Sequence, residues 1–180
     1  DIFPDSTLTF PAPYFRKEFV VAKPIKKAMA YVCGLGFYEM YFNGERVGEQ
    51  VLAPAVTNYD RRSLKKLLYH YDDQSTQRVF YNVFDVTGNL KMQNNAIGII
   101  LGNGWYNQRR TVEGHMWYDV PKMILQLEIE YEDGTKEMIV SDNSWKTTTG
   151  PLLHDAIFTG EIYDARKDLG HWNRESYDDN

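Results

Sequence analysis

The stretch that decides the fold is Leu125-Gln126-Leu127-Glu128-Ile129-Glu130-Tyr131, in which apolar and polar residues alternate strictly. Successive side chains of a β-strand point to opposite faces, so this pattern predicts a strand with one face in a core. The expected core residues are Leu125, Leu127, Ile129 and Tyr131. Asp133-Gly134 then predicts a tight turn into a second strand over 136–140. Together they predict a β-hairpin.

The rest of the chain also shows patterns typical of β-strands and turns. A second hairpin is predicted over 37–48 around the turn Asn43-Gly44, with Tyr38, Met40 and Phe42 on one face of its first strand. Further strands are expected at 14–21, 28–33, 67–71, 78–84, 96–101 and 159–164. No long stretch has a helical period, although 86–90 can form one short helical turn. The sequence therefore predicts an all-β fold, one antiparallel β-sandwich over residues 1–180.

Composition narrows the function classes. The 180 residues are 43% hydrophobic and 25% charged, which is typical of a globular domain. The net charge is −5, with no basic patch beyond short pairs, so nucleic acid is not an expected partner. No run of apolar residues is long enough for a membrane-spanning helix, and we expect no membrane partner. The chain does not begin with Met, and we expect it to be part of a longer protein.

Cysteine and histidine provide little metal or redox chemistry. The single cysteine, Cys33, excludes an internal disulfide or a cysteine-based zinc site, and we expect a buried, inert thiol. The four histidines are scattered, which argues against a histidine-based metal site: His70, His115, His154 and His171.

Two long irregular stretches, 49–62 and 102–120, interrupt the expected strands. Loops of this length are uncommon in compact domains and are often functional. The second begins in Leu101-Gly102-Asn103-Gly104-Trp105-Tyr106, where an apolar run breaks into glycines and aromatics. Glycines allow close approach of the backbone to a ligand, and aromatic rings offer flat apolar faces with a polar edge. This stretch is the main candidate for ligand binding.

Recognition of a pyranose needs an aromatic platform and polar groups that bracket neighbouring hydroxyls. Both loops supply such groups, and we hypothesise a sugar site formed by Asn58, Tyr59, Asp60, Arg61, Asn103, Trp105, Tyr106, Asn107, Gln108 and Arg109. The alternative is a packing role, in which Asn58 and Asp60 cap a turn and Trp105 covers the edge of the core.

Glycosidase chemistry needs two suitably placed carboxyl groups. The best candidate carboxylates are Glu161 and Asp164. They are three residues apart, and on a strand this spacing puts them on opposite faces. We expect Arg166 to form an ion pair with one of them that stabilises the chain at a domain boundary. We expect no catalytic residue in this chain.

Several phrases, read in order, resemble one family. They are Cys33-Gly34-Leu35-Gly36-Phe37-Tyr38-Glu39-Met40-Tyr41-Phe42-Asn43-Gly44, Leu52-Ala53-Pro54, Thr57-Asn58-Tyr59-Asp60, Asn95-Ala96-Ile97, Leu101-Gly102-Asn103-Gly104-Trp105-Tyr106, Asp142-Asn143-Ser144-Trp145 and Gly160-Glu161-Ile162-Tyr163-Asp164-Ala165-Arg166. The chain resembles the N-terminal β-sandwich region of bacterial α-L-rhamnosidases, of the glycoside hydrolase family 78 type.

The resemblance implies a galactose-binding-like jelly roll within a multidomain, secreted or periplasmic enzyme that removes terminal α-L-rhamnose from plant glycans. Its catalytic (α/α)₆ barrel would lie C-terminal to this segment. In some relatives the domain binds rhamnose with a calcium ion, and in others no sugar site is demonstrated. We therefore expect an accessory, rhamnose-binding domain that requires no cofactor. If calcium binds, Asn58, Asp60 and Asn103 are the candidate oxygen ligands.

Three alternatives stay open. The domain can be a structural one that supports the catalytic barrel and binds no ligand. It can be a self-contained hydrolase, which release of product from an aryl rhamnoside by the fragment would establish. It can also recognise a protein through a tyrosine-rich sheet face, for which an exposed apolar patch would be the sign.

Overall fold

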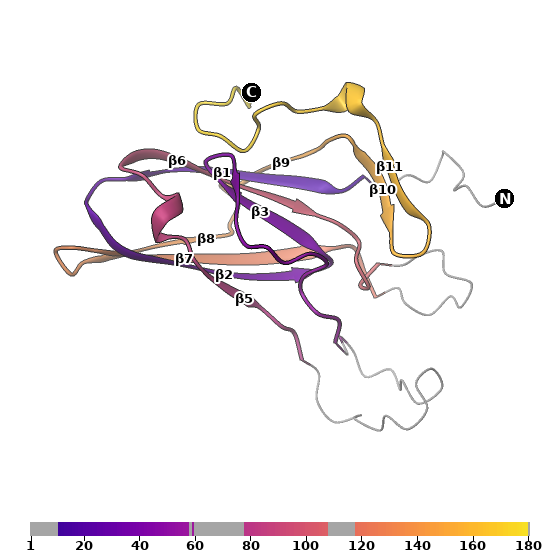
Figure 1. Ribbon diagram of the computed structural model, residues 1–180, viewed down its shortest axis with the longest axis horizontal. Helices are drawn as coiled ribbons and strands as arrows, with labels where there is room; N and C mark the ends of the chain where they lie inside the picture. The colour runs from indigo at the N-terminus through magenta and orange to yellow at the C-terminus, as the bar shows by residue number, and fades with distance from the viewer. Residues whose placement is uncertain (1–10, 58, 60–77, 108–117, 180) are drawn as a thin grey trace.

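The computed structural model describes residues 11–57, 59, 78–107 and 118–179. Two antiparallel sheets lie face to face (Figure 1). The five-stranded sheet has the order β4-β3-β6-β1-β9, with β1 Pro13–Val21, β3 Tyr38–Phe42, β4 Glu45–Arg46, β6 Gln93–Leu101 and β9 Lys146–Thr149. The four-stranded sheet has the order β5-β2-β7-β8, with β2 Ile25–Leu35, β5 Asn82–Asp85, β7 Lys122–Tyr131 and β8 Lys136–Val140. The predicted antiparallel jelly-roll β-sandwich is confirmed.

The core lies between these sheets and is formed by alternate residues of their inner faces. Leu125, Leu127 and Ile129 of β7 are fully buried, as their alternation predicts. Met40 and Phe42 of β3 are equally buried and lie in the same apolar cluster. Antiparallel pairing of β3 and β1 with β6 holds the opposite wall of this core in register.

A separate hairpin stands beside the five-stranded sheet. It consists of β10 Leu152–Ala156 and β11 Gly160–Tyr163, which pair only with each other among the described strands (Figure 1). The backbone N–H of Ala12 donates to the carbonyl of Leu152 over 3.0 Å and links the hairpin to the start of β1. The hairpin thereby forms a wall at one end of the sandwich.

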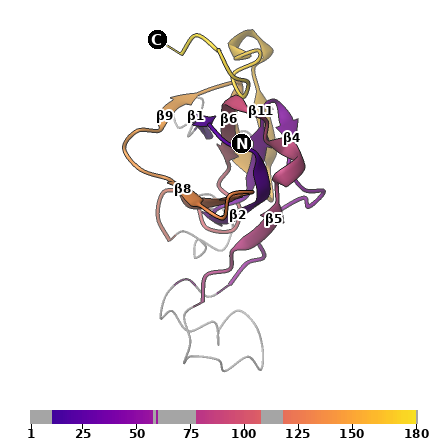
Figure 2. The same cartoon turned by 90° about the vertical axis from the view of Figure 1, so that its left-hand side faces the viewer.

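The C-terminal segment 165–179 begins with a short 3₁₀ helix, η4 Ala165–Lys167, and runs back over the five-stranded sheet (Figures 1 and 2). Trp172 is buried there, edge-on to Tyr14 with ring centroids 5.0 Å apart. Arg16 of β1 is also buried, and its guanidinium donates to the carbonyls of Trp172 over 2.7 Å and Arg174 over 2.8 Å. A buried guanidinium needs such partners, so these bonds fix the segment to the sheet.

Several sequence expectations need correction. The strand predicted over 78–84 is shorter and later, because only Asn82–Asp85 pairs with β2. Strands β9 and β10 were not predicted, and the strand expected over 67–71 lies outside the described residues. Cys33 is half-buried rather than buried, because it lies on the outward face of β2. The helical turn expected over 86–90 is confirmed as the 3₁₀ helix η3 Thr87–Asn89.

No helix in the described ranges has both the length and the apolar character needed to cross a membrane. That the whole chain forms one domain stays a prediction.

Candidate functional site

The loop that follows β6 is fixed to the hairpin by Asn103. Its backbone N–H donates to Oδ1 of Asp155 over 2.6 Å, and its side-chain Nδ2 donates to Oδ2 and to the carbonyl of Asp155, each over 3.0 Å. Asn107 Nδ2 in turn donates to Oδ1 of Asn103 over 2.6 Å. Both asparagines are buried, so their amides hold the loop in place.

Asp155 is at the centre of this contact between the loop and the hairpin, which we call the joint. Burial raises the pKa of its carboxyl, and the hydrogen bonds from Asn103 act in the opposite direction because they stabilise the carboxylate. The link between the loop and the hairpin thus depends on a buried carboxylate. Its charge is unfavourable to bury, and the hydrogen bonds that Asn103 donates to it offset this cost.

The predicted aromatic residues of the two loops make contact with other rings. Trp105 is half-buried and lies edge-on to Phe158 of the hairpin tip, with centroids 5.6 Å apart. Tyr59 lies edge-on to both Tyr106 and Tyr118, at 5.2 Å in each case, and Tyr106 stacks on Tyr118 at 5.6 Å. The structure therefore brings the loops together at Tyr59 and Tyr106, through a cluster of three tyrosines.

The remaining predicted residues cannot be placed. Asn58, Asp60, Arg61, Gln108 and Arg109 lie outside the described residues. A sugar contact by any residue of the predicted set stays a prediction.

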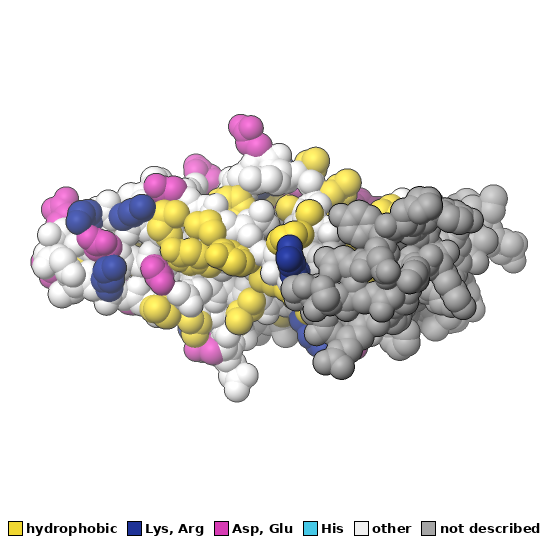
Figure 3. All heavy atoms as spheres, turned by 90° about the horizontal axis from the view of Figure 1, so that it is seen from below, with side chains coloured by type: hydrophobic (Ala, Val, Ile, Leu, Met, Phe, Trp, Pro, Cys, Tyr) yellow, Lys and Arg dark blue, Asp and Glu magenta, His cyan; other side chains and the backbone are white. Residues whose placement is uncertain are grey.

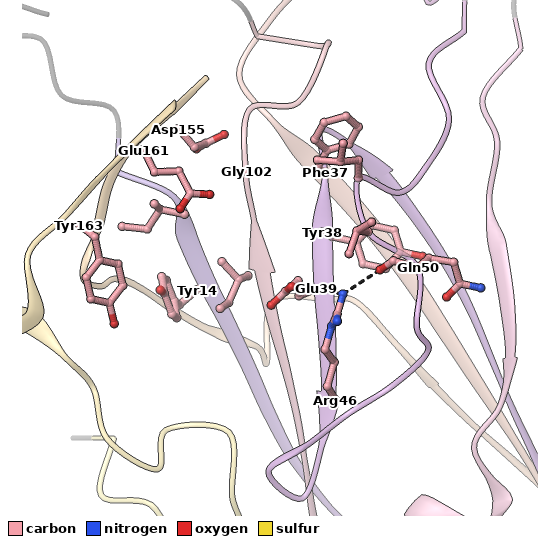
Figure 4. Close-up of a pocket in the computed structure, with 14 residues that line it drawn as sticks. Tyr14, Phe37, Tyr38, Glu39, Arg46, Gln50, Gly102, Asp155, Glu161 and Tyr163 are labelled. Atoms are coloured by element: carbon pink, nitrogen blue, oxygen red, sulfur yellow. Dashed lines mark hydrogen bonds and ion pairs between the residues drawn. The ribbon is translucent and has the colours of Figure 1, made fainter. Parts of the chain in front are cut away.

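A cavity of about 420 Å³ lies next to this joint, on the outer face of the five-stranded sheet. The hairpin forms one wall, and the segment after β4 forms the opposite wall (Figure 4). The lining residues are Tyr14, Phe37, Tyr38, Glu39, Arg46, Gln50, Val51, Leu52, Ile100, Gly102, Leu152, Asp155, Glu161 and Tyr163. Asp155 belongs to both the joint and the cavity, and Gly102 of the predicted loop also lines the cavity, so the cavity adjoins that loop.

One wall of the cavity is arranged by Arg46 of β4. Its Nη2 donates to the carbonyl of Gln50 over 2.7 Å and lies 3.3 Å from a carboxylate oxygen of Glu39 (Figure 4). The other carboxylate oxygen of Glu39 accepts from the hydroxyl of Tyr41 over 2.6 Å. These bonds hold a cation and an anion side by side at the cavity rim.

The floor and the hairpin wall contribute aromatic and acidic groups. Burial, with smaller effects from Tyr163, Asp168, Glu39 and Glu161, raises the pKa of Tyr14 to about 12. Tyr14 is therefore a neutral phenol that can donate a hydrogen bond across the neutral range. Glu161 and Tyr163 project from β11 on the far side (Figure 4).

The sequence singled out Glu161 but missed Tyr14, Arg46 and Tyr163. The outward position of Glu39 was visible in the pattern, since it lies opposite the core residues of β3, whereas β11 is exposed at all four positions. What could not be seen is that the hairpin folds back over β1 and β6, because that depends on contacts distant in sequence. The carboxylate expected to pair with Arg166 is Asp164, with both bonds at 2.8 Å, and the pairing lowers the pKa of Asp164 to about 2.

Calcium finds limited support in the described residues. Among them, no group of three or more His, Cys, Asp or Glu side chains could hold a metal ion. Asn103 is the only predicted calcium ligand within the described ranges, and its Oδ1 already accepts from Asn107. A calcium site stays a prediction.

The sandwich, with its hairpin and loop, can be compared with known proteins. The family model of the α-L-rhamnosidase N-terminal domain matches residues 23–75 and 66–180. The chain belongs to this family. The resemblance predicted from the sequence phrases is thereby confirmed.

Individual relatives agree with the α-L-rhamnosidase N-terminal domain. An α-L-rhamnosidase of Formosa agariphila is 38% identical over 94% of this chain, which spans 17% of that protein. The structure of an α-L-rhamnosidase from Dictyoglumus thermophilum is 46% identical, with a TM-score of 0.77 over 94% of this chain and 17% of that one.

The crystal structure of Streptomyces avermitilis α-L-rhamnosidase complexed with L-rhamnose is 34% identical, with a TM-score of 0.82 over 96% of this chain and 15% of that one. The chain thus spans about a sixth of the length of the relatives it matches.

Proposed function

We propose that this domain is a carbohydrate-binding accessory module of an α-L-rhamnosidase, with L-rhamnose or a terminal rhamnosyl group as its ligand. The observation that carries the proposal is the cavity between β11 and the segment after β4, where aromatic and charged side chains face one space. Its volume of about 420 Å³ lies in the range of small-molecule sites. The parent enzyme would hydrolyse terminal rhamnose, and a secreted or periplasmic location follows from the resemblance as a further prediction.

The chemistry of the cavity suits a deoxyhexose. The hydroxyls of a pyranose both donate and accept, so Glu39 and Glu161 can accept from them while Arg46 donates. Tyr163, which is 59% exposed, offers a flat ring for the apolar face that the methyl group of rhamnose enlarges. The solved relative complexed with L-rhamnose supports this choice of sugar.

The second candidate function is a structural domain without a ligand. The observation in its favour is that Asn103, Tyr106 and Asn107 are all buried and engaged with other parts of the domain. Three residues of the predicted sugar site therefore have a packing role.

Titration of the chain with L-rhamnose, with and without calcium, distinguishes the two functions. We expect Tyr163→Ala to weaken binding by up to about tenfold, since one aromatic contact is worth about 0.5–1.5 kcal/mol. The matched control is Tyr81→Ala, because Tyr81 is 63% exposed and lies next to the four-stranded sheet, outside the cavity. Absence of binding heat in both conditions, with an intact fold, would favour the structural domain. An equal loss in both variants would exclude the cavity as the site.

A further inference from the structure

The outward face of the four-stranded sheet carries an apolar surface that the sugar site does not use. Its exposed members are Tyr81, Val83, Ile124, Met138 and Val140; together with the half-buried Tyr31 we name them the outer apolar face (Figure 3). Ile124 is 63% and Met138 57% exposed. The solvent-facing side of an antiparallel sheet normally carries polar residues, so this face departs from the expected pattern.

Strand register places these residues on one face of the four-stranded sheet. Tyr31 of β2 is paired with Val83 of β5 and with Gln126 of β7, and Gln126 is paired with Val140 of β8. Tyr31 also contacts Tyr81, with ring centroids 6.5 Å apart. Each of the four strands thus contributes an apolar side chain to this face, with Gln126 and Glu128 of β7 lying among them, and the apolar residues are gathered rather than scattered singly over the surface.

The outward face of the five-stranded sheet, by contrast, is partly covered by the domain itself. There the C-terminal segment covers the strands, with Trp172 packed on Tyr14 and Tyr41. No described segment covers the outer apolar face in the same way (Figures 1 and 3). The domain's own C-terminal segment covers the five-stranded sheet, whereas the apolar residues of the four-stranded sheet are left exposed to a partner.

We propose that the outer apolar face docks against another domain of the same polypeptide. The chain spans about 17% of the relatives it matches, so most of such a protein lies outside it. A tethered domain meets this face at an effective concentration of about millimolar, so a modest apolar contact is sufficient. Interfaces between domains of one chain bury about 600–1,500 Å², a size that a face of four strands can supply.

Charge argues against a second copy of this chain as the partner. Asp85 lies at the side of the outer apolar face and Glu128 lies within it, between Met29 and Met138, while Lys27 is close enough to Asp85 to attract its carboxylate. The chain as a whole carries a net charge of −5, so two copies repel one another. The partner surface should be apolar at its centre, with lysine or arginine opposite Asp85 and Glu128.

Hydroxyl-radical footprinting of the full-length parent polypeptide tests the docking. Met138 on the face and Met92 outside it are matched probes, because they are 57% and 45% exposed in this domain. With the face covered, Met138 is oxidised several-fold more slowly than Met92. With the face free, Met138 is oxidised at least as fast, and that result would overturn the proposal.

Two further arms identify the partner. Ile124→Glu in the full-length polypeptide should raise the oxidation rate of Met138, whereas Val20→Glu, at a 53% exposed position of β1, should leave it unchanged. Equal rates of Met138 oxidation in these two variants, both slow, would contradict docking through Ile124. Protection of Met138 that disappears on dilution would assign the face to a second copy and overturn the intramolecular contact. None of these readouts depends on sugar binding, so failure here leaves the proposed function standing.

Discussion

At the residue scale, Asp155 connects the parts of the candidate site. It accepts hydrogen bonds from the backbone and side chain of Asn103, and it lines the cavity from the hairpin side. A carboxylate in this position is costly to bury, but loss of its acceptors would leave buried N–H groups of the loop without partners. The position of the loop and that of the hairpin therefore both depend on the hydrogen bonds between Asn103 and Asp155.

We expect Asp155→Asn to lower the free energy of unfolding by about 1–3 kcal/mol, because the amide nitrogen cannot accept from Asn103. The cost should grow on acidification. Burial raises the pKa of Asp155 above its unfolded value of 3.8, so its contribution to stability is full below that pH and is lost as pH rises through the folded value. Urea unfolding of both proteins between pH 7 and pH 4 checks this, and a gap that narrows at low pH would contradict it.

Side-chain identity alone did not reveal the structural contact of Asn103. The sequence placed it in a sugar site because amides bind hydroxyls, which stays a prediction, and the structure adds that its amide bonds to Asp155, which is 52 residues later in the chain. Trp105 likewise contacts Phe158 of the hairpin tip. Polar and aromatic residues in a glycine-rich loop indicate a structured loop, and only the tertiary fold decides whether they contact a ligand or a neighbouring strand.

At the scale of the element, the strands with strict alternation were predictable and the others were not. The pattern of β7 and β8 and the turn at Asn43-Gly44 are local, and both residues of that turn adopt positive φ, 52° and 88°, as such a hairpin requires. Strand β9 is exposed at all four positions, Lys146–Thr149, so it has no apolar period. It is a strand because it pairs with the edge of β1, and this depends on the rest of the sheet.

Packing of the C-terminal segment on β6 gives a second prediction. A Cβ atom at Gly98 would lie 2.7 Å from ring carbons of Trp172, so Gly98→Ala must displace the segment or the strand. We expect a loss of about 1–3 kcal/mol in unfolding free energy and faster proteolysis within 165–179. Gly88→Ala is the control, because nothing lies within 4 Å of its added Cβ atom. Equal stability of the two variants would mean that Trp172 does not occupy this place.

At the scale of the whole molecule, the two ends of the described chain are held together by charge. Arg16 bonds to Asp179 over 2.5 Å, and Lys146 of β9 bonds to the same carboxylate over 2.7 Å. The hydrogen bond from Lys146, with further help from Arg16, lowers the pKa of Asp179. This cluster joins the end of the chain to two strands of one sheet.

Acid should therefore loosen the C-terminal segment before it unfolds the sandwich. A lowered pKa means that the stabilisation by Asp179 is present above its unfolded value of 3.8 and is lost as pH falls through the folded value. The effect is worth about 1 kcal/mol, because Lys146, which makes the largest contribution, is 55% exposed and salt screens its bond to Asp179. Proteolysis within 165–179 should increase below pH 4 in the wild type, and Asp179→Asn should show that faster cleavage already at pH 7. A variant that is cleaved at the wild-type rate at pH 7 would exclude this role.

The β10–β11 hairpin has a consequence for how this domain family can diversify. It contributes no residue to the apolar core cluster, yet it supplies one wall of the cavity. Substitutions in Glu161 or Tyr163 can therefore be sampled by natural selection with little penalty to folding, while each one reshapes the recognition surface. If the cavity binds a sugar as proposed, ligand preference should drift faster than architecture among such domains, and Glu161 and Tyr163 of β11 are the positions to randomise in a library that seeks a new specificity, with Asp155 kept.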